Sequence, residues 1–295
     1  MKFCVWGFKN SYNTFRHIHE AFYRALKMTG REVSWLDDQD NTSSLDFSNT
    51  FFISMNYAVQ GMPRRRDCFY AVHNVEARAK EYLFGFPLLN YGLYVDSMNV
   101  DGWIALNEDT FFHRQEWDSY SSVVFRWGTD LLPHEIEANK PTKVFRNESL
   151  VCNFVGTAIE NLAPFKRACE ESGKDLKVYS GVSVEENIEL IRKSYMAPAI
   201  NIPYQTEVGY VPCRIFKNIS YGQFGMTNNK AVDKLFQGRL IYNSDPYQLF
   251  YDGKDRLPSI PLRELHSLMD EVSEKHTYLN KIDALLKSAA LMREA

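Results

Sequence analysis

The chain has 295 residues, of which 45% are hydrophobic and 24% are charged, and its formal net charge at pH 7 is −3. This length exceeds that of one typical domain and the apolar content is enough for two cores, so we expect two domains. A net negative charge gives no general attraction to phosphate backbones, which argues against a protein whose main partner is nucleic acid.

The five cysteines are widely spaced and contain no C-x-x-C pair, which argues against a disulfide framework and a zinc site. They are typical of reduced thiols in a cytoplasmic compartment. The first residues form too short an apolar run for a signal peptide, and no later window holds about 18 apolar residues in succession. We therefore expect a soluble cytoplasmic protein.

The first half alternates short apolar segments with helical patterns. Strands are predicted at 2–8, 32–36, 51–55, 67–72, 100–106 and 122–126. Asn13 and Thr14 can cap a helix in which apolar residues recur at helical spacing until Gly30. Alternation of this kind indicates a parallel sheet with helical crossovers, so the first half is predicted to be Rossmann-like.

The pattern restarts after a polar stretch, 133–148, which we expect to be a linker. Strands are predicted at 150–155, 176–179, 199–202 and 224–227, helices at 163–172 and 185–195, and a mostly helical tail after Pro261. The expected architecture is α/β, with two Rossmann-like domains that face each other across a cleft. Its domains would be 1–140 and 141–262, followed by C-terminal helices at 263–295.

The segment 209–229 has the most informative pattern in the chain. Tyr210-Val211-Pro212 resembles a loop that enters a helix at its proline, and Gly222 is suited to end that helix. Within the helix, Ile215, Phe216, Ile219 and Ser220 are expected to face the core, whereas Arg214 and Lys217 share another side. Two cations near a helix start favour an anion, so this helix is predicted to bind a diphosphate.

Loops at the carboxyl ends of parallel strands are where ligands bind in such sheets. Asn13, Thr14 and Arg16 follow the first strand and could contact a phosphate or an acceptor, although an ordinary helix cap explains them as well. His73 and Glu76 follow the fourth strand and could act as a general base toward a hydroxyl. A structural histidine is the alternative for His73.

Two further strand-end loops contain candidate residues. Asp130 follows Trp127-Gly-Thr and would act as a base or simply cap a turn. Gly156 and Thr157 follow the first strand of the second half, where a glycine lets the backbone approach a ligand. The run 64–66 holds three arginines, which suit a solvated loop, an anionic acceptor or a peripheral membrane contact.

Several motifs of other enzyme classes are missing from the sequence. It contains no G-x-G-x-x-G, G-x-x-x-x-G-K-[ST], G-x-S-x-G, H-E-x-x-H or D-x-D pattern. Their absence argues against a classical dinucleotide oxidoreductase, a P-loop kinase, an α/β hydrolase, a zinc protease and a metal-dependent sugar transferase.

Taken in order, the motifs resemble those of GT-B glycosyltransferases, closest to the CgeB-like branch and the group 1 glycosyl transferases. The donor-binding half is similar in Phe154-Val-Gly-Thr157, in Pro212-Cys-Arg-Ile-Phe-Lys217, and in His276-Thr-Tyr278 near the end. In the first half, His73-Asn74 resembles the strand-end His-Asn of that family, and Gly128-Thr-Asp130 the G-x-D before its linker.

The resemblance implies that Arg214 binds the diphosphate of a nucleotide-sugar and that Tyr210 and Val211 lie beside the nucleotide or sugar. Lys217 stands where the family usually has a glutamate that accepts hydrogen bonds from ribose, and would instead be a second phosphate ligand. A metal-independent mechanism without a cofactor follows, with the nucleotide-sugar as co-substrate. His73, Glu76 and Asp130 remain alternatives for the base, and the resemblance leaves inverting and retaining chemistry open.

The leading hypothesis is a cytoplasmic hexosyl- or pentosyltransferase that acts in glycan biosynthesis. It would move a sugar from a nucleotide-sugar donor to a hydroxyl of a glycan, lipid-linked or protein acceptor. A nucleotide-sugar epimerase of the same two-domain shape is one alternative, and a non-catalytic nucleotide-sugar binding protein is another.

Overall fold

The computed structural model describes residues 1–11, 13–93, 102–116, 120–157 and 160–294. The chain forms two compact units. The first unit contains the described residues within 1–93, 102–126 and 278–294, and the second contains those within 127–277. These units divide the chain after Arg126, whereas the expected domain boundary lay at residue 140.

In the described residues of the first unit, eight strands form one sheet in the order β2-β1-β3-β4-β5-β8-β7-β6. The strands are β1 (Lys2–Trp6), β2 (Val33–Leu36), β3 (Thr50–Met55), β4 (Phe69–His73), β5 (Leu88–Leu93), β6 (Ile104–Asn107), β7 (Thr110–Glu116) and β8 (Tyr120–Phe125). The first six strands in this order pair in parallel, and β7 and β6 pair antiparallel at the edge. The parallel part is the predicted Rossmann-like sheet.

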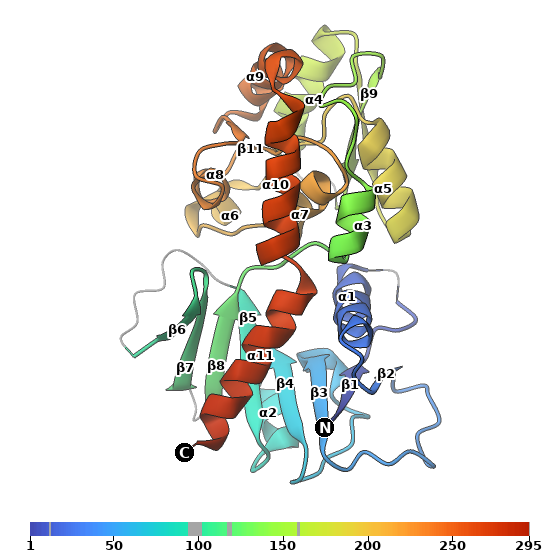
Figure 1. Cartoon of the computed structure of the whole chain (residues 1–295), viewed down its shortest axis with the longest axis vertical. Coiled ribbons are helices and arrows are strands. Elements are labelled where there is room, and N and C mark those ends of the chain that lie inside the picture. The colour runs from blue at the N-terminus through green and yellow to red at the C-terminus, as the bar shows by residue number, and fades with distance from the viewer. Residues whose placement is uncertain (12, 94–101, 117–119, 158–159, 295) are drawn as a thin grey trace. The chain divides into compact units, whose positions relative to one another are not determined.

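Helices of the first unit cover the sheet. They are α1 (Thr14–Met28), η1 (Asn56–Ala58), α2 (Ala77–Leu83) and α11 (Tyr278–Arg293). Helix α11 packs beside α1 and against β5, β7 and β8 (Figure 1). The Phe22 and Tyr278 rings, which join these two helices, lie 4.7 Å apart edge to face. Cys4 and Trp6 alternate with Phe3 and Val5 along β1 and share a core cluster with Ala79 and Leu83 of α2. Both faces of the sheet are therefore buried, as parallel sheets require.

The second unit has short parallel strands surrounded by helices. Its strands are β9 (Val151–Val155), β10 (Asp175–Tyr179), β11 (Met226–Thr227) and β12 (Ile241–Tyr242), and its helices are α3 (Pro133–Ala138), α4 (Leu162–Glu171), α5 (Val184–Lys193), α6 (Pro203–Glu207), α7 (Cys213–Ser220), α8 (Lys230–Leu235), α9 (Pro246–Arg256), η2 (Leu257–Ser259) and α10 (Leu262–Lys275). Strand β9 pairs with β10, β11 pairs with β12, and Ala199 forms a parallel bridge to Thr227. Each of these pairings runs parallel, so the carboxyl ends of the paired strands lie on the same side. The two pairs are separate sheets, which we together call the small sheet.

Helix α7 confirms the prediction made from its sequence pattern. Pro212 is its N-cap residue, and Gly222 follows its end with φ +92°, a conformation that favours glycine. Ile215, Phe216 and Ile219 are fully buried in the core of the second unit. The helix runs from the carboxyl edge of the small sheet to its amino edge, where β11 begins.

Three expected elements differ in the structure. The stretch 133–148 begins with α3 and buries Ile136 and Val144 in the core of the second unit, so it is not a solvated linker. The strand expected at 199–202 is reduced to the bridge at Ala199, because Pro203 starts α6. The segment expected at 100–106 forms β6 from Ile104 and pairs antiparallel with β7, a strand that the sequence pattern missed; residues 100 and 101 lie outside the described residues.

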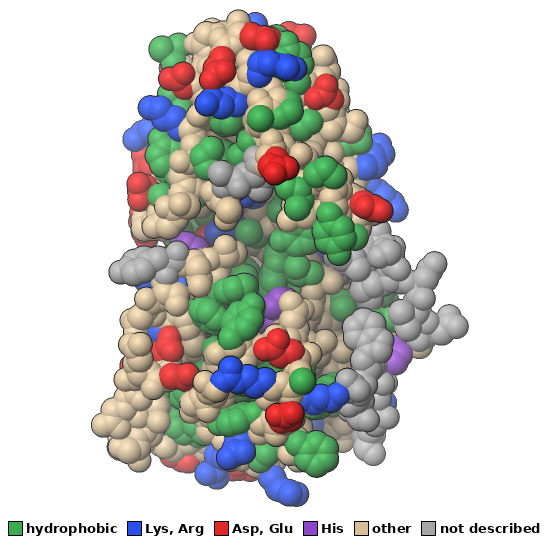
Figure 2. All heavy atoms as spheres, turned by 180° about the vertical axis from the view of Figure 1, so that it is seen from behind, with side chains coloured by type: hydrophobic (Ala, Val, Ile, Leu, Met, Phe, Trp, Pro, Cys, Tyr) green, Lys and Arg blue, Asp and Glu red, His purple; other side chains and the backbone are tan. Residues whose placement is uncertain are grey.

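Positively and negatively charged side chains are mixed on the surface. Figure 2 shows Lys and Arg side chains interspersed with Asp and Glu side chains over much of one face, in keeping with a nearly balanced charge.

Within the described ranges, none of the helices has both the length and the apolar character needed to cross a bilayer.

Candidate functional site

Arg214 lies at the carboxyl edge of the small sheet in the second unit. Its Nε donates to the carbonyl of Val155, at the end of β9, at 3.1 Å, and its Nη1 donates to the carbonyl of Ile200 at 3.4 Å. The guanidinium carbon lies 3.9 Å from the centroid of the Phe154 ring. Backbone and ring contacts therefore hold this cation at the strand ends, where parallel sheets bind ligands.

No carboxylate among the described residues forms an ion pair with Arg214. Burial lowers the pKa of the Arg214 guanidinium, and the neighbouring Cys213 and Tyr210 oppose this change. A guanidinium stays charged even so, and a partly buried charge without a counterion is costly. The arrangement suits an anionic ligand with oxygen atoms for the remaining N–H donors.

Gly156 packs directly against this guanidinium. It has φ +146°, and a Cβ atom built on it would lie 2.3 Å from Arg214 Nη2. Any side chain at this position would displace the cation, so the glycine is needed for more than the turn. Thr157, the next residue, is exposed at the same edge. The structure thus brings together Gly156 and Arg214, two of the donor-site candidates from the sequence.

A network of asparagines lies at the same edge, and the sequence reading missed it. The side chains of Asn201 and Asn229 both donate to the carbonyl of Tyr210, at 3.2 Å and 2.8 Å. Asn228 Oδ1 accepts from the backbone N–H of Asn201 at 2.8 Å, and Asn228 Nδ2 donates to the carbonyl of Asn201 at 3.0 Å. These bonds fix Tyr210 at the entrance to α7, and Val211 beside it is buried.

Asn201 Oδ1 is a buried acceptor for which the described residues supply no donor. Buried acceptors are rarely left unsatisfied, so this oxygen can accept from a ligand hydroxyl or N–H. Asn201 was missed because it lies inside the strand predicted at 199–202; the structure ends that strand at Ala199, which places Asn201 in a strand-end loop. It therefore belongs with Arg214 in the candidate site.

Lys217 and Asp130 pair with each other. Lys217 Nζ lies 2.7 Å from Asp130 Oδ2, and the Tyr221 hydroxyl donates to Asp130 Oδ1 at 2.6 Å. The side chains of Lys217 and Asp130 are only 13% and 4% exposed. Burial lowers the pKa of Lys217, but the Asp130 carboxylate outweighs it and the net pKa is raised. Both oxygens of Asp130 are engaged, which makes this carboxylate a poor general base in this state.

The segment that carries Asp130 is itself held by the residues before the last helix. The Thr129 backbone N–H donates to the carbonyl of His276 at 2.9 Å, and Thr129 bridges Thr277 in parallel. A Cβ atom on Gly128 would lie 2.3 Å from the His276 oxygen, so a glycine is needed there. The His276 ring lies 4.6 Å from that of Phe216 in α7. Two motifs far apart in the sequence therefore meet beside α7.

In the first unit, His73 ends β4 and is 4% exposed. Its Nδ1 lies 2.8 Å from the carbonyl oxygen of Tyr91. A carbonyl only accepts, so Nδ1 carries the hydrogen and Nε2 is the acceptor nitrogen of the neutral ring. Burial lowers the pKa of His73 to about 4, the Tyr91 hydrogen bond opposes this, and the charge of His19 adds to it. Asn74 follows with φ +50°, a strained conformation at a strand end.

The other candidates in the first unit are more exposed. Glu76 is exposed at the start of α2 and makes no capping hydrogen bond. Asn13 caps α1, because its side chain accepts from the Arg16 backbone N–H at 3.1 Å, and Thr14 is exposed. Arg16 Nε lies 3.9 Å from Glu20 Oε2. The helix-cap alternative therefore explains Asn13 in the structure.

Across the described ranges, no group of three His, Cys, Asp or Glu side chains is placed to hold a metal ion.

No protein-family model matches the chain, and no curated protein sequence matches it either. Among solved structures, the DNA-modifying enzyme β-glucosyltransferase, determined with and without its substrate uridine diphosphoglucose, has a TM-score of 0.50 and 10% identity. The match covers 98% of this chain and 100% of that chain. A UDP-forming α,α-trehalose-phosphate synthase from Burkholderia xenovorans, in complex with glucose-6-phosphate, has a TM-score of 0.48 and 8% identity over 78% of this chain and 73% of that chain. The likeness to the β-glucosyltransferase confirms the predicted fold: the chain has the α/β GT-B fold.

Proposed function

We propose that the protein is a glycosyltransferase that transfers a hexosyl or pentosyl group from a nucleotide-sugar to an acceptor hydroxyl. The observation that carries the proposal is the Arg214 guanidinium, held at the carboxyl edge of the small sheet without a carboxylate partner in the described residues. A nucleoside diphosphate is the anion that GT-B chemistry releases, and an edge of this kind in an α/β unit is where nucleotides bind.

The roles of the second-unit residues follow from their contacts. Arg214 binds the diphosphate and stabilises the charge that develops on it as the bond from the anomeric carbon breaks. Gly156 and Thr157 bring backbone close to the phosphates, and Asn201 Oδ1 accepts from a donor hydroxyl or base N–H. Tyr210, held by the asparagines, lies beside the nucleotide or sugar, with Val211 as its apolar support.

His73 is the candidate general base of the first unit. In the reaction, the acceptor oxygen forms a bond to the anomeric carbon, the diphosphate leaves with the electron pair of the broken bond, and the acceptor proton passes to a base. In a neutral imidazole whose Nδ1 donates to a carbonyl, Nε2 is the basic nitrogen, and we propose that this atom takes the proton. Glu76 is the second candidate. We propose that this step needs no metal ion or cofactor.

Lys217 and Asp130 take a different role from the one the resemblance implied. Because each neutralises the other, we propose that the pair positions α7 and, through it, Arg214. Charge from Lys217 would still add to the field at the diphosphate, but its first partner is Asp130. The CgeB-like subtype, the acceptor class of glycan, lipid-linked or protein, and a cytoplasmic location stay predictions.

A thermal-shift screen of nucleotide-sugars tests the proposal, because a ligand that binds the folded state raises the melting temperature. The nucleotide-sugar that binds is then incubated with a panel of acceptors, and release of nucleoside diphosphate is measured. We expect release that depends on the acceptor, and loss of donor binding in Arg214→Gln. Arg167→Gln is the matched control, since Arg167 also lies over a ring, that of Tyr247, at 4.6 Å.

The same assay separates the alternatives. An epimerase would convert the nucleotide-sugar without any acceptor, and a binding protein would bind it tightly without turnover. Equal donor affinity in wild type, Arg214→Gln and Arg167→Gln would contradict the proposed donor site.

A further inference from the structure

A second group of cations lies at the opposite, amino edge of the small sheet. Arg146 precedes β9, and Arg192 lies in the last turn of α5, just before Tyr195, whose backbone N–H donates to the carbonyl of Val151 at 2.7 Å. Arg146 and Arg192 line a cavity of about 430 Å³, which we call the amino-edge pocket. The other charged residues of its lining are Lys140, Lys143, Lys193 and Glu189. Gly156 and Arg214 lie at the other ends of the strands, so the two places are distinct.

The lysines and arginines of this pocket differ in their partners. Lys140 pairs with Glu137 and Asp270, Lys143 with Glu148, and Lys193 with Glu189. Arg146 and Arg192 form no ion pair in the part of the chain that the structure describes. The lysine charges are therefore neutralised, whereas the two guanidinium charges are left without counterions.

The two guanidinium groups also lie near each other and are half-buried. Burial lowers the pKa of Arg146, the charge of Arg192 lowers it further, and Glu148 only partly opposes this. Like charges in a partly desolvated place repel, so the native state carries a cost that a bound anion would remove. Two neighbouring positive charges are best neutralised by one dianion.

The hydrogen bonds leave donors on both arginines. Arg146 Nη1 donates weakly to the carbonyls of Val144 and Gly222, each at 3.5 Å, and Arg192 Nη1 donates to Asn139 Oδ1 at 3.2 Å. Within the described residues, Nε and Nη2 of each arginine make no hydrogen bond to protein. A guanidinium has five N–H donors in a planar fork that fits two oxygens of a phosphate. The free donors therefore match a tetrahedral oxyanion.

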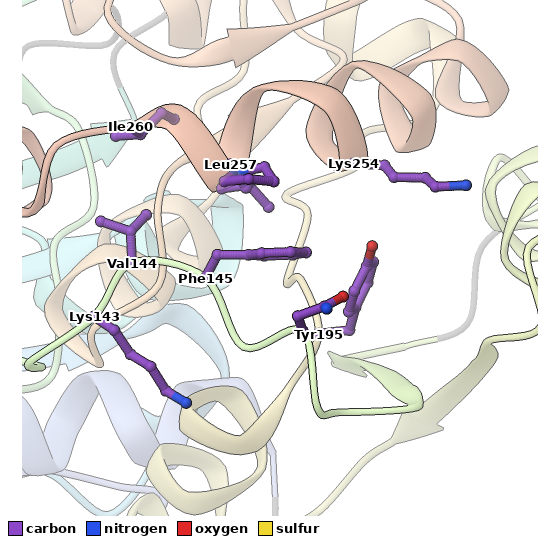
Figure 3. A pocket seen from close by; sticks show the side chains of 9 residues that line it. Lys143, Val144, Phe145, Tyr195, Lys254, Leu257 and Ile260 are labelled. Carbon is purple, nitrogen blue, oxygen red and sulfur yellow. The ribbon is translucent and has the colours of Figure 1, made fainter.

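A second pocket lies next to the amino-edge pocket and shares Lys143 with it. Its lining is mixed: it contains Phe145, Tyr195, Leu257 and Ile260, and also Lys143, Asn147 and Lys254. In Figure 3 the Lys143 side chain points away from the rings of Phe145 and Tyr195. The ammonium group thus turns away from these rings, and Lys143 lines the amino-edge pocket as well.

We propose that the amino-edge pocket binds a phosphate dianion, free or as the phosphomonoester group of a small molecule, through Arg146 and Arg192. This site is independent of the proposed donor site. The alternative is a purely structural role, in which the two arginines only hold the segment from Asn139 to Arg146 in place. That explanation accounts for one nitrogen of each guanidinium and leaves the unpaired charges unexplained.

Calorimetric titration at fixed ionic strength tests the proposal, with inorganic phosphate, glycerol 3-phosphate and dimethyl phosphate as probes. We expect both dianions to bind and the dimethyl phosphate monoanion to bind at least tenfold more weakly. Binding of glycerol 3-phosphate but not of inorganic phosphate would identify the phosphomonoester as the form that is recognised. R146Q and R192Q should each weaken the binding of phosphate by about tenfold or more, whereas R167Q and R214Q should leave the affinity for phosphate unchanged.

Chemical labelling places the ligand without depending on how well a variant folds. In the wild-type protein, 10 mM phosphate should slow modification of Arg146 and Arg192 by p-hydroxyphenylglyoxal at least threefold in peptide mass spectra, and should not slow that of Arg167. No binding of any dianion at 10 mM, equal protection of all arginines, or loss of phosphate binding in R214Q but not in R146Q and R192Q would overturn the proposal.

Discussion

Lys217 Nζ lies 2.7 Å from Asp130 Oδ2, in a place where both side chains are almost fully buried. The pair joins α7 to the segment that Thr129 ties to His276 and Thr277, and Tyr221 from the same helix completes the contacts of Asp130. The helix that presents Arg214 is thus anchored three residues after it. Anchoring and ligand binding are separable functions of the two cations, and the variants below separate them.

Replacing Lys217 by methionine should destabilise the second unit. The substitution removes the ammonium group that faces the buried Asp130 carboxylate, and breaking a buried ion pair on one side costs about 3–5 kcal/mol. The expected result is a lower urea midpoint and faster amide hydrogen exchange in α7. Lys217→Met/Asp130→Asn is the matched variant and should recover most of the loss, because it removes both charges and keeps an acceptor for Tyr221.

If Lys217 were chiefly a phosphate ligand, the opposite pattern would appear. Donor affinity would fall in Lys217→Met with little change in the urea midpoint, and the double variant would restore nothing.

Gly156→Ala should weaken donor binding by at least tenfold. The added Cβ would lie 2.3 Å from Arg214 Nη2, so the guanidinium has to leave its place over Phe154. Gly181→Ala is the control for backbone strain, because Gly181 also has a positive φ, +68°, and a Cβ there meets nothing within 4 Å. Calorimetric titration of the nucleotide-sugar in both variants measures the effect. Equal losses in the two variants would attribute the effect to strain and not to Arg214.

How far the sequence predicted this fold depends on whether a segment has a local signal. Helix α7 has an amphipathic face bounded by Pro212 and Gly222, and its limits were predicted within a residue or two. Strand β5 (Leu88–Leu93) has neither an amphipathic pattern nor clear boundary residues. It is a short apolar run that contains a glycine, and the sequence pattern did not predict it. Strand β6 was expected to be parallel because the preceding strands are, and the short turn to β7 makes it antiparallel instead.

The candidate site shows the same limit. The position of Arg214 at a strand edge follows from local order along the chain, and it was predicted. The pairing of Lys217 with Asp130 depends on how distant segments pack, and no periodicity encodes it. The asparagines at 201, 228 and 229 were passed over because each alone is an ordinary loop residue; only their shared contacts with Tyr210 and with one another distinguish them.

Mild acid should destabilise the first unit. Burial lowers the pKa of both His19 and His73 to about 4, against an ordinary value near 6.5. The unfolded chain therefore takes up protons first as the pH falls, so the stability is complete above pH 6.5 and is lost between pH 6.5 and 4. The loss is about 3 kcal/mol per histidine at pH 4. Urea midpoints at half-unit pH steps measure it.

The variant His19→Gln identifies the source of that loss. It removes one of the two linked protonations and should reduce the slope of stability against pH in this range to about half. His134→Gln, at an exposed position, is the control and should leave the slope unchanged. A slope that is the same in wild type and His19→Gln would show that other groups cause the acid loss.

His73→Gln should reduce kcat by about 10²–10⁴ while donor affinity stays within about twofold, because a positioned general base contributes that much to a transfer step. A base acts only when deprotonated, and the lowered pKa of His73 keeps it neutral down to about pH 4. The acid limb of kcat/KM in the wild type should therefore lie near pH 4, after correction for the folded fraction, and not near 6.5. Initial rates of nucleoside diphosphate release at each pH measure both quantities. Glu76→Gln, three residues further on, is the matched comparison: a larger loss of kcat there than in His73→Gln would transfer the role of base to Glu76.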